Sequence, residues 1–181
     1  MTSTAPPEAE QCELLDHRMT RITVVAEGSF DAFQARFDAT LPAATPQDLV
    51  REVQTWQQAV ALVEAKAPFG LLIYRKGQVH AVMGLAGHTA TCASYLIGNF
   101  TVAERAYGIN PSVLLYFPFQ VCLWEGKDGR PRGSWDQPSS AVAVLQNEVI
   151  SQVAREFDLM FGRLLQSLGC VVPDVLREPA H

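Results

Sequence analysis

Between residues 69 and 135 the sequence alternates short apolar segments with turn-forming residues. Runs of this length are typical of β-strands, and glycine-containing turns between consecutive runs are typical of hairpins. The sequence therefore predicts an antiparallel meander whose strands follow one another along the chain. The predicted strands cover residues 69–74, 79–85, 89–97, 113–124 and 130–135.

A strand and a helix are predicted before this meander. Residues 21–27 are rich in β-branched side chains and end at a glycine, which indicates a strand followed by a turn. Ser29 can cap the next helix, in which Phe30, Phe33 and Phe37 recur at spacings of three and four. These three rings share one face and are predicted to pack against the sheet.

Three further helices are predicted from caps and periodicity. Thr45 followed by Pro46 marks one helix start, and residues 101–104 match a capping box. Apolar residues recur at three and four through 150–168, and Gly169 is a suitable stop signal. A consecutive antiparallel sheet bracketed by helices predicts an α+β two-layer domain, with the helices packed on one face of the sheet.

Composition and length set the domain organisation. The chain has 181 residues, of which 48% are hydrophobic, so one folded domain is expected at residues 18–171. Residues 1–17 lack periodicity and are predicted to form a flexible arm, with a similar tail at 172–181. No signal-peptide pattern and no membrane-spanning run are present, which predicts a cytoplasmic protein without a membrane partner.

Charge and cysteine spacing limit the partners. The formal net charge of −5 is opposite to the basic surface that phosphate backbones require, so no nucleic-acid partner is expected. The four cysteines form no CxxC pair and no close cluster with histidine, and no cofactor motif is present. The sequence therefore predicts no metal site and no cofactor.

One candidate site lies where the third meander strand passes through Gly98 into a helix. Free N–H groups at such a helix start can bind a carboxylate or phosphate, unless Asn99 or Thr101 only caps the helix. A small apolar or anionic molecule is predicted to lie here, between the sheet and the helices, held by aromatic and polar side chains. The candidate ligand-binding residues are Tyr95, Asn99, Phe100, Arg105, Tyr107 and Tyr116.

The sequence resembles the domain of unknown function 302 family. The resemblance lies in three stretches around this junction, 93–105, 110–125 and 127–129. The resemblance extends over residues 20–168 and implies a TBP-like βαβ4α arrangement and a homodimer. The family has no established activity to transfer. The stretch 42–66 is longer than the family's minimal domain and is a place where a local lid or helix could be added.

Three functions are consistent with these patterns. The first is small-molecule binding, with enzymatic activity left undecided because no catalytic motif is present. The second is a homodimeric interaction module without catalysis, because both faces of the predicted 113–124 strand are largely apolar and a partner would cover the second face. The third is haem or metal binding through His80, His88 or Cys92.

Overall fold

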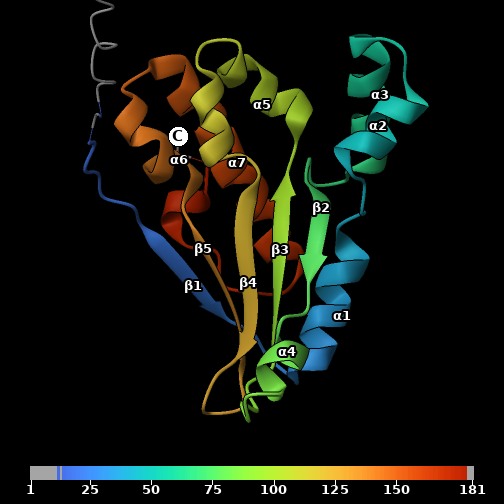
Figure 1. Ribbon diagram of the computed structural model, residues 1–181, viewed down its shortest axis with the longest axis vertical. Coiled ribbons are helices and arrows are strands. Elements are labelled where there is room, and N and C mark those ends of the chain that lie inside the picture. The colour runs from blue at the N-terminus through green and yellow to red at the C-terminus, as the bar shows by residue number, and fades with distance from the viewer. Residues whose placement is uncertain (1–11, 13, 179–181) are drawn as a thin grey trace, which may run out of the picture.

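The computed structural model describes residue 12 and residues 14–178, and within them the α+β prediction is confirmed. Five strands form one antiparallel sheet in the order β1-β5-β4-β3-β2 (Figure 1). The strands are β1 Arg21–Val25, β2 Leu72–Gly77, β3 Cys92–Gly98, β4 Phe119–Glu125 and β5 Pro131–Asp136. Each of β2, β3 and β4 pairs with the next strand along the chain, and β1 pairs with β5.

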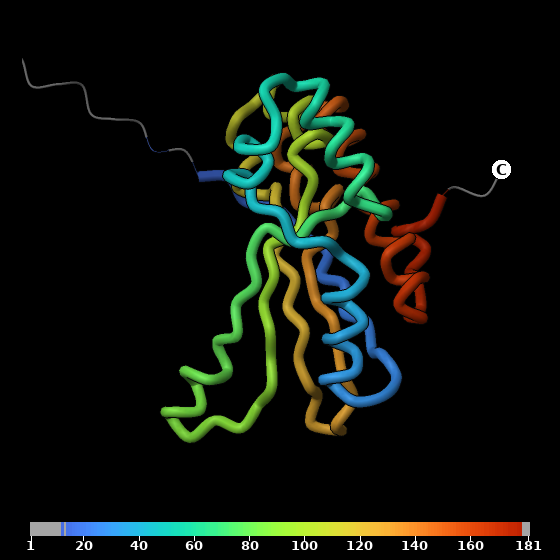
Figure 2. The backbone as a smooth tube through the Cα atoms, turned by 90° about the vertical axis from the view of Figure 1, so that its right-hand side faces the viewer, coloured from blue at the N-terminus to red at the C-terminus, as the bar shows by residue number. Residues whose placement is uncertain are grey.

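Two helices cover one face of this sheet, as predicted. They are α1 (Phe30–Thr40) and α7 (Glu148–Ser167), and Figure 2 shows α1 beside the strands. Ser29 caps α1 by accepting a hydrogen bond from the Ala32 N–H, and Phe30, Phe33 and Phe37 are buried. Alternate strand residues point into the same core, because successive side chains of a strand lie on opposite faces. The βαβ4α order is thus present, with additional helices inserted.

The inserted helices α2 (Pro46–Glu52) and α3 (Trp56–Lys66) build a second, smaller core. They lie beside the upper end of β2 in Figure 1. Thr45 caps α2 and forms the capping box with Asp48. Leu72 and Tyr74 of β2 pack in this second core, so the insertion covers a part of the sheet that α1 and α7 do not reach.

The segment leading into α2 also runs along the outer edge of β2. The Ile73 N–H donates to the Pro42 carbonyl, and the Ala44 N–H donates to the Ile73 carbonyl. Ala43 and Ile73 therefore form a parallel bridge outside the five strands.

The predicted strand at 79–85 is wrong. This segment contains the short helix α4 (His80–Gly84), which has no buried residue and lies at the tip of the β2–β3 connection. Val82 and Leu85 are exposed, so the apolar run never reaches the sheet. A short apolar run does not distinguish a strand from a helical turn without a partner strand to hydrogen-bond it.

The predicted strand at 113–124 is correct only in its second half. Its first half is a 3-10 helix, η1 (Pro111–Leu115), and β4 begins at Phe119. Asn110 starts η1 by accepting a hydrogen bond from the Ser112 N–H, and Pro118 lacks the N–H group that a ladder position needs. The apolar side chains of 113–116 therefore do not extend the sheet.

The helix α5 (Phe100–Tyr107) begins two residues earlier than the capping box at 101–104 predicts, because Asn99 and not Thr101 is its N-cap. After β5 the chain forms α6 (Pro138–Ala141) and the 3-10 turn η2 (Val142–Leu145) before α7. Within the described residues, no helix is both long and apolar enough to span a membrane. The predicted arm at 1–17 falls largely on residues 1–11 and 13, outside the described residues.

The C-terminal segment packs against the domain, beyond the predicted domain boundary at residue 171. It contains the 3-10 turn η3 (Asp174–Leu176), whose Leu176 is 1% exposed and belongs to the main core. A side chain at Gly162 would meet the Leu176 carbonyl oxygen at 2.1 Å, so only glycine lets the segment approach α7 this closely. The packed part of the chain therefore extends at least to Leu176.

The second face of the sheet is mixed rather than apolar. Polar and apolar side chains alternate across it, and most are only half-buried. Its outward positions are Arg21, Thr23 and Val25 in β1; Arg132, Ser134 and Asp136 in β5; Gln120, Cys122 and Trp124 in β4; and Cys92, Ser94 and Leu96 in β3. We call this surface the open face.

Candidate functional site

The junction between β3 and α5 uses its own polar groups internally. The Asn99 side-chain oxygen accepts hydrogen bonds from the N–H groups of Thr101 and Val102, and its amide donates to the Gly70 carbonyl at 2.9 Å. The Phe100 N–H donates to the Tyr74 hydroxyl at 2.9 Å. The N–H groups that would hold an anion therefore have protein partners, which matches the capping alternative.

Tyr95 is buried on the helix side of β3 and belongs to a separate, partly exposed polar cluster. Its hydroxyl donates to the Asp38 carboxylate at 2.9 Å and accepts from the Gln34 amide at 3.1 Å, while Lys76 pairs with the same carboxylate. Burial raises the pKa of Tyr95 well above its ordinary value. This cluster is internally satisfied and joins α1 to β2 and β3.

The other predicted site residues are dispersed. Arg105 pairs with Glu156 of α7, and this contact raises the pKa of the guanidinium. Tyr107 is exposed at the end of α5. Tyr116 makes an edge contact with the His17 ring, 6.2 Å between centroids. The six candidate residues therefore do not share one pocket.

The core between the sheet and the helices α1 and α7 contains a small cavity that none of the six candidate residues lines. Among the described residues, the cavity at this interface measures about 10 Å³ and is lined by core side chains such as Phe33, Trp135 and Phe161. A space of this size is about one water-sized probe. Aromatic side chains surround this cavity, including Trp135 stacked on Phe161 with 5.2 Å between ring centroids.

A larger groove lies near the same junction but outside the main core, between α2–α3 and the start of α5. It has a volume of about 330 Å³, and Phe100 is the predicted site residue that lines it. Phe100 is held there by stacking on Tyr74, 4.6 Å between ring centroids. Its lining consists of Pro46, Leu49, Val50, Val53, Gln54, Thr55, Trp56, Ala59, Phe100 and Thr101. We call this the Trp56 groove.

Exposed apolar side chains distinguish the Trp56 groove. Val50 is 76% exposed and Trp56 is 46% exposed, although both lie on helices that pack against the domain. Sequence reasoning did not select either residue as a site residue. The sequence does contain an indication of this surface. Leu49, Val50 and Val53 are three apolar residues in or next to one short helix, more than a single buried helix face accommodates.

A second groove, of about 450 Å³, lies at the upper end of the open face. Tyr116 lines it together with Leu114, Leu115, Leu96 and the N-terminal Met19. Its polar groups include Asp136, which forms an ion pair with Arg21. We call this the Tyr116 groove.

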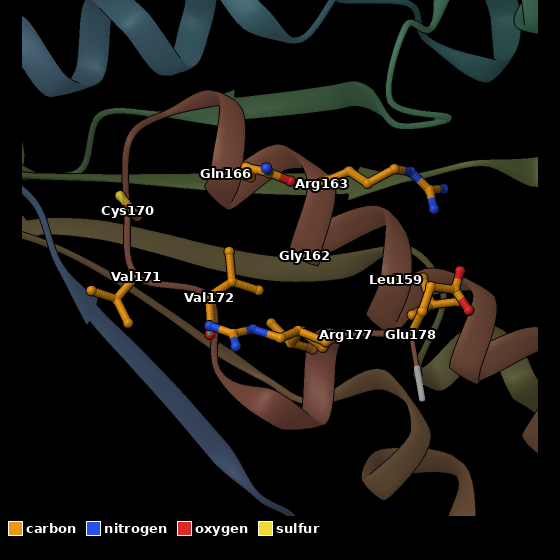
Figure 3. A pocket seen from close by; sticks show the side chains of 10 residues that line it. Leu159, Gly162, Arg163, Gln166, Cys170, Val171, Val172, Arg177 and Glu178 are labelled. Atoms are coloured by element: carbon orange, nitrogen blue, oxygen red, sulfur yellow. Dashed lines mark hydrogen bonds between the residues drawn. The ribbon is translucent and has the colours of Figure 1, made fainter. Parts of the chain in front are cut away.

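A third groove, of about 690 Å³, lies between α7 and the C-terminal segment (Figure 3). Arg163 and Gln166 of α7 and Arg177 of the segment are among its lining residues. Arg177 donates to the Val172 carbonyl and pairs with Asp174, so it ties the segment to itself. The groove exists because this segment docks beside Gly162.

The proposed metal and haem residues do not form a cluster. His80 contacts the Cys92 carbonyl through its ring nitrogen at 2.8 Å, and His88 is exposed. Within residues 14–178 and residue 12, no group of three or more His, Cys, Asp or Glu side chains could hold a metal ion. The free cysteines include Cys92 and Cys122, which are half-buried.

Comparison with known families agrees with this fold. The family model described as "Domain of unknown function DUF302" matches residues 50–168. The chain belongs to the DUF302 family. The resemblance inferred from the 93–105 and 110–125 segments is therefore confirmed, and the matched range includes α3, so part of the Trp56 groove lies inside the DUF302 region.

A solved DUF302 structure has the same fold. The crystal structure of an uncharacterized conserved DUF302 protein from Bacillus stearothermophilus matches with a TM-score of 0.60 and 13% sequence identity. The match covers 82% of this chain and 97% of that chain. No curated protein matches. At this identity the comparison supports the α+β architecture alone.

Proposed function

We propose that the domain binds a small, uncharged and mostly apolar molecule in the Trp56 groove. The observation that carries this proposal is the lining: a volume of about 330 Å³ is bounded mostly by aromatic and aliphatic side chains, with Gln54, Thr55 and Thr101 as its polar members and no titratable side chain. Ligand pockets for small molecules start at roughly 300 Å³ and are mostly apolar with a few polar groups.

The same lining favours binding without catalysis. Acid–base or nucleophilic chemistry needs a titratable side chain within reach of the ligand, and the groove contributes none. It also contains no lysine or arginine, which favours a neutral ligand over an anionic one. The exposed amide of Gln54 is a group that could hydrogen-bond one polar substituent of the ligand.

A titration with the uncharged apolar dye N-phenyl-1-naphthylamine tests this proposal. Val50→Asn removes apolar surface from the groove at an exposed position, so folding should be unaffected. Losing about 1.4 kcal/mol of apolar contact corresponds to roughly tenfold weaker binding. Leu85→Asn is the matched control, because Leu85 is 90% exposed on the distant α4 tip.

Saturable one-to-one binding that Val50→Asn weakens and Leu85→Asn leaves unchanged is the expected result. Equal dye affinity in the wild type, Val50→Asn and Trp56→Ala would rule out the Trp56 groove as the binding site. An equal loss in Leu85→Asn would mean that the dye reports general surface hydrophobicity.

A second proposal concerns self-association through the Tyr116 groove. Leu114, Leu115 and Met19 expose large apolar side chains around it, and Leu115 is 81% exposed. A second copy of the chain would remove this surface from water in a symmetric homodimer. Sedimentation velocity at micromolar concentration should give a dimer that Leu115→Glu dissociates, and a wild-type monomer would contradict the proposal.

A cytoplasmic location completes the proposal. Cys92, Cys122 and Cys170 are free thiols in the fold, as is typical of proteins in reducing compartments. Thiol alkylation in intact cells, followed by mass spectrometry, should find these cysteines reduced; disulfide-linked peptides would contradict it.

A further inference from the structure

Two cysteines are neighbours on the open face. The register pairs Cys92 of β3 with Trp124 of β4, and Ser94 with Cys122. Cys92 and Cys122 are therefore diagonal neighbours on adjacent strands, with both side chains on the same face of the sheet.

The hydrogen-bond pattern places both cysteines at the closer type of position. The Glu125 N–H donates to the Thr91 carbonyl, so this pair is hydrogen-bonded and the next pair, Cys92 with Trp124, is not. The pair of Ser94 with Cys122 is of the same type, because the two types alternate. Strands approach to about 4.5 Å between Cα atoms at such pairs.

The side chains directly opposite each cysteine lean away from the pair. The Trp124 indole N–H donates to the Ser134 hydroxyl at 3.1 Å, and Arg132 lies 5.2 Å from the ring centroid, so the ring is held toward β5. Ser94 leans toward β2, because its hydroxyl is 2.9 Å from where a side chain at Gly77 would begin. Neither of these two side chains is therefore directed between Cys92 and Cys122.

We propose that Cys92 and Cys122 form a two-thiolate site for a soft monovalent metal ion, with Cu(I) as the representative. Thiolates are the ligands that select Cu(I). Binding forms two sulfur–copper bonds and releases one proton from each thiol, and no electron is transferred. Zn²⁺ would need about four ligands, and within the described residues these two thiols have no third and fourth partner for a metal.

Spacing favours a bridging ion over a disulfide. The Cα atoms of diagonal neighbours lie roughly 7–8 Å apart, whereas a disulfide usually joins residues whose Cα atoms are about 4.4–6.8 Å apart. Two metal–sulfur bonds of about 2.3 Å each bridge a sulfur–sulfur distance of roughly 4.6 Å, which suits the wider pair.

The electrostatic surroundings are consistent with this geometry. Burial and the neighbouring Cys92 thiol raise the pKa of Cys122, while the Arg21 guanidinium acts in the opposite direction. Arg21 also pairs with Asp136, so only part of its charge is available to offset the negative charge of a dithiolate–Cu(I) unit. The thiols must lose protons to bind, so the metal affinity should increase with pH.

Anaerobic competition with the Cu(I) chelator bicinchoninate tests the proposal. The Cys12→Ser protein, which lacks the exposed N-terminal thiol, should take up one equivalent of Cu(I). Losing an outer-sphere partner already costs about 10–100-fold in metal affinity, so Cys92→Ser or Cys122→Ser should cost at least about 100-fold. Cys170→Ala, which removes the thiol in the main core, is the control and should bind as the parent does.

A second measurement needs no variant at the site. Cu(I) loading of the full-length protein should protect Cys92 and Cys122 from iodoacetamide while Cys12 remains reactive, as read by peptide mass spectrometry. Uptake of less than one equivalent, unchanged affinity in both serine variants, or alkylation of Cys92 and Cys122 in the loaded protein would each overturn the proposal.

Discussion

Replacing Gly162 with alanine should destabilise the protein, although the residue lies in the middle of a long helix. Helix propensity alone predicts the opposite, because alanine is favoured over glycine by about 1 kcal/mol in a helix interior. The added methyl group would lie 2.1 Å from the Leu176 carbonyl oxygen and 3.2 Å from its carbon. Both are backbone atoms, so the C-terminal segment must move away from α7.

The cost follows from what that segment buries. Leu176 is 1% exposed, and fully burying a leucine side chain contributes about 1.5–3 kcal/mol. Subtracting the propensity gain leaves a net loss of about 0.5–2 kcal/mol, which lowers the melting temperature by roughly 1–8 °C in a chain of this size. Release of the segment should also expose Leu176 to chymotrypsin.

Thermal denaturation and limited chymotrypsin digestion measure the two effects. Gly108→Ala is the matched control, because Gly108 has a helical φ of −62° and its nearest obstacle is 3.6 Å away. In a chain that lacks residues 173–181, Gly162→Ala should instead stabilise the protein. A melting temperature of full-length Gly162→Ala equal to or above that of the wild type would refute the reasoning.

Two further predictions concern buried polar groups. Asp158 is 3% exposed and accepts hydrogen bonds from the Gln137 amide and the Ser139 N–H, and burial raises its pKa. Asp158 therefore loses its proton at a lower pH in the unfolded state than in the folded state. The free energy of unfolding of the wild type, minus that of Asp158→Asn, should fall as the pH rises from acidic to neutral. Chemical denaturation at several pH values measures this difference, and a difference independent of pH would contradict the prediction. Asn99→Ala removes the cap of α5 and the bond to Gly70, and should cost about 2 kcal/mol by the same assay, whereas a loss below about 0.5 kcal/mol would show that water replaces the side chain.

The elements that could be predicted from the sequence carry their own local signals. The Phe30, Phe33 and Phe37 spacing and the Thr45–Pro46 start are such signals, and both helices form where predicted. The errors occur at 79–85 and 113–116, where apolar side chains are present but no strand pairs with them. Strand pairing depends on residues far away in the sequence, so a single apolar run does not reveal whether a partner strand is present.

The candidate site shows the same limit. Phe100 was predicted to bind a ligand and does line the Trp56 groove, but Val50 and Trp56 reach it from another part of the chain. The side chains of Tyr95 and Arg105 are of types that bind ligands. In the fold, however, the Tyr95 hydroxyl donates to Asp38 and Arg105 is paired with Glu156. Which polar groups remain free depends on partners that the spacing of residues along one segment does not reveal.

The bridge between Ala43 and Ile73 has a consequence for how the protein can aggregate. The main chain of 42–44 occupies the hydrogen-bonding groups of Ile73 at the outer edge of β2, so an incoming strand finds no continuous row of donors and acceptors there. Within the described residues, the outer edge of β1 carries no strand of its own. Growth of this sheet by intermolecular strand addition would therefore start more readily at β1 than at the Ile73 end of β2, and amyloid-like association should be more sensitive to changes in Arg21–Val25 than to changes at Ile73.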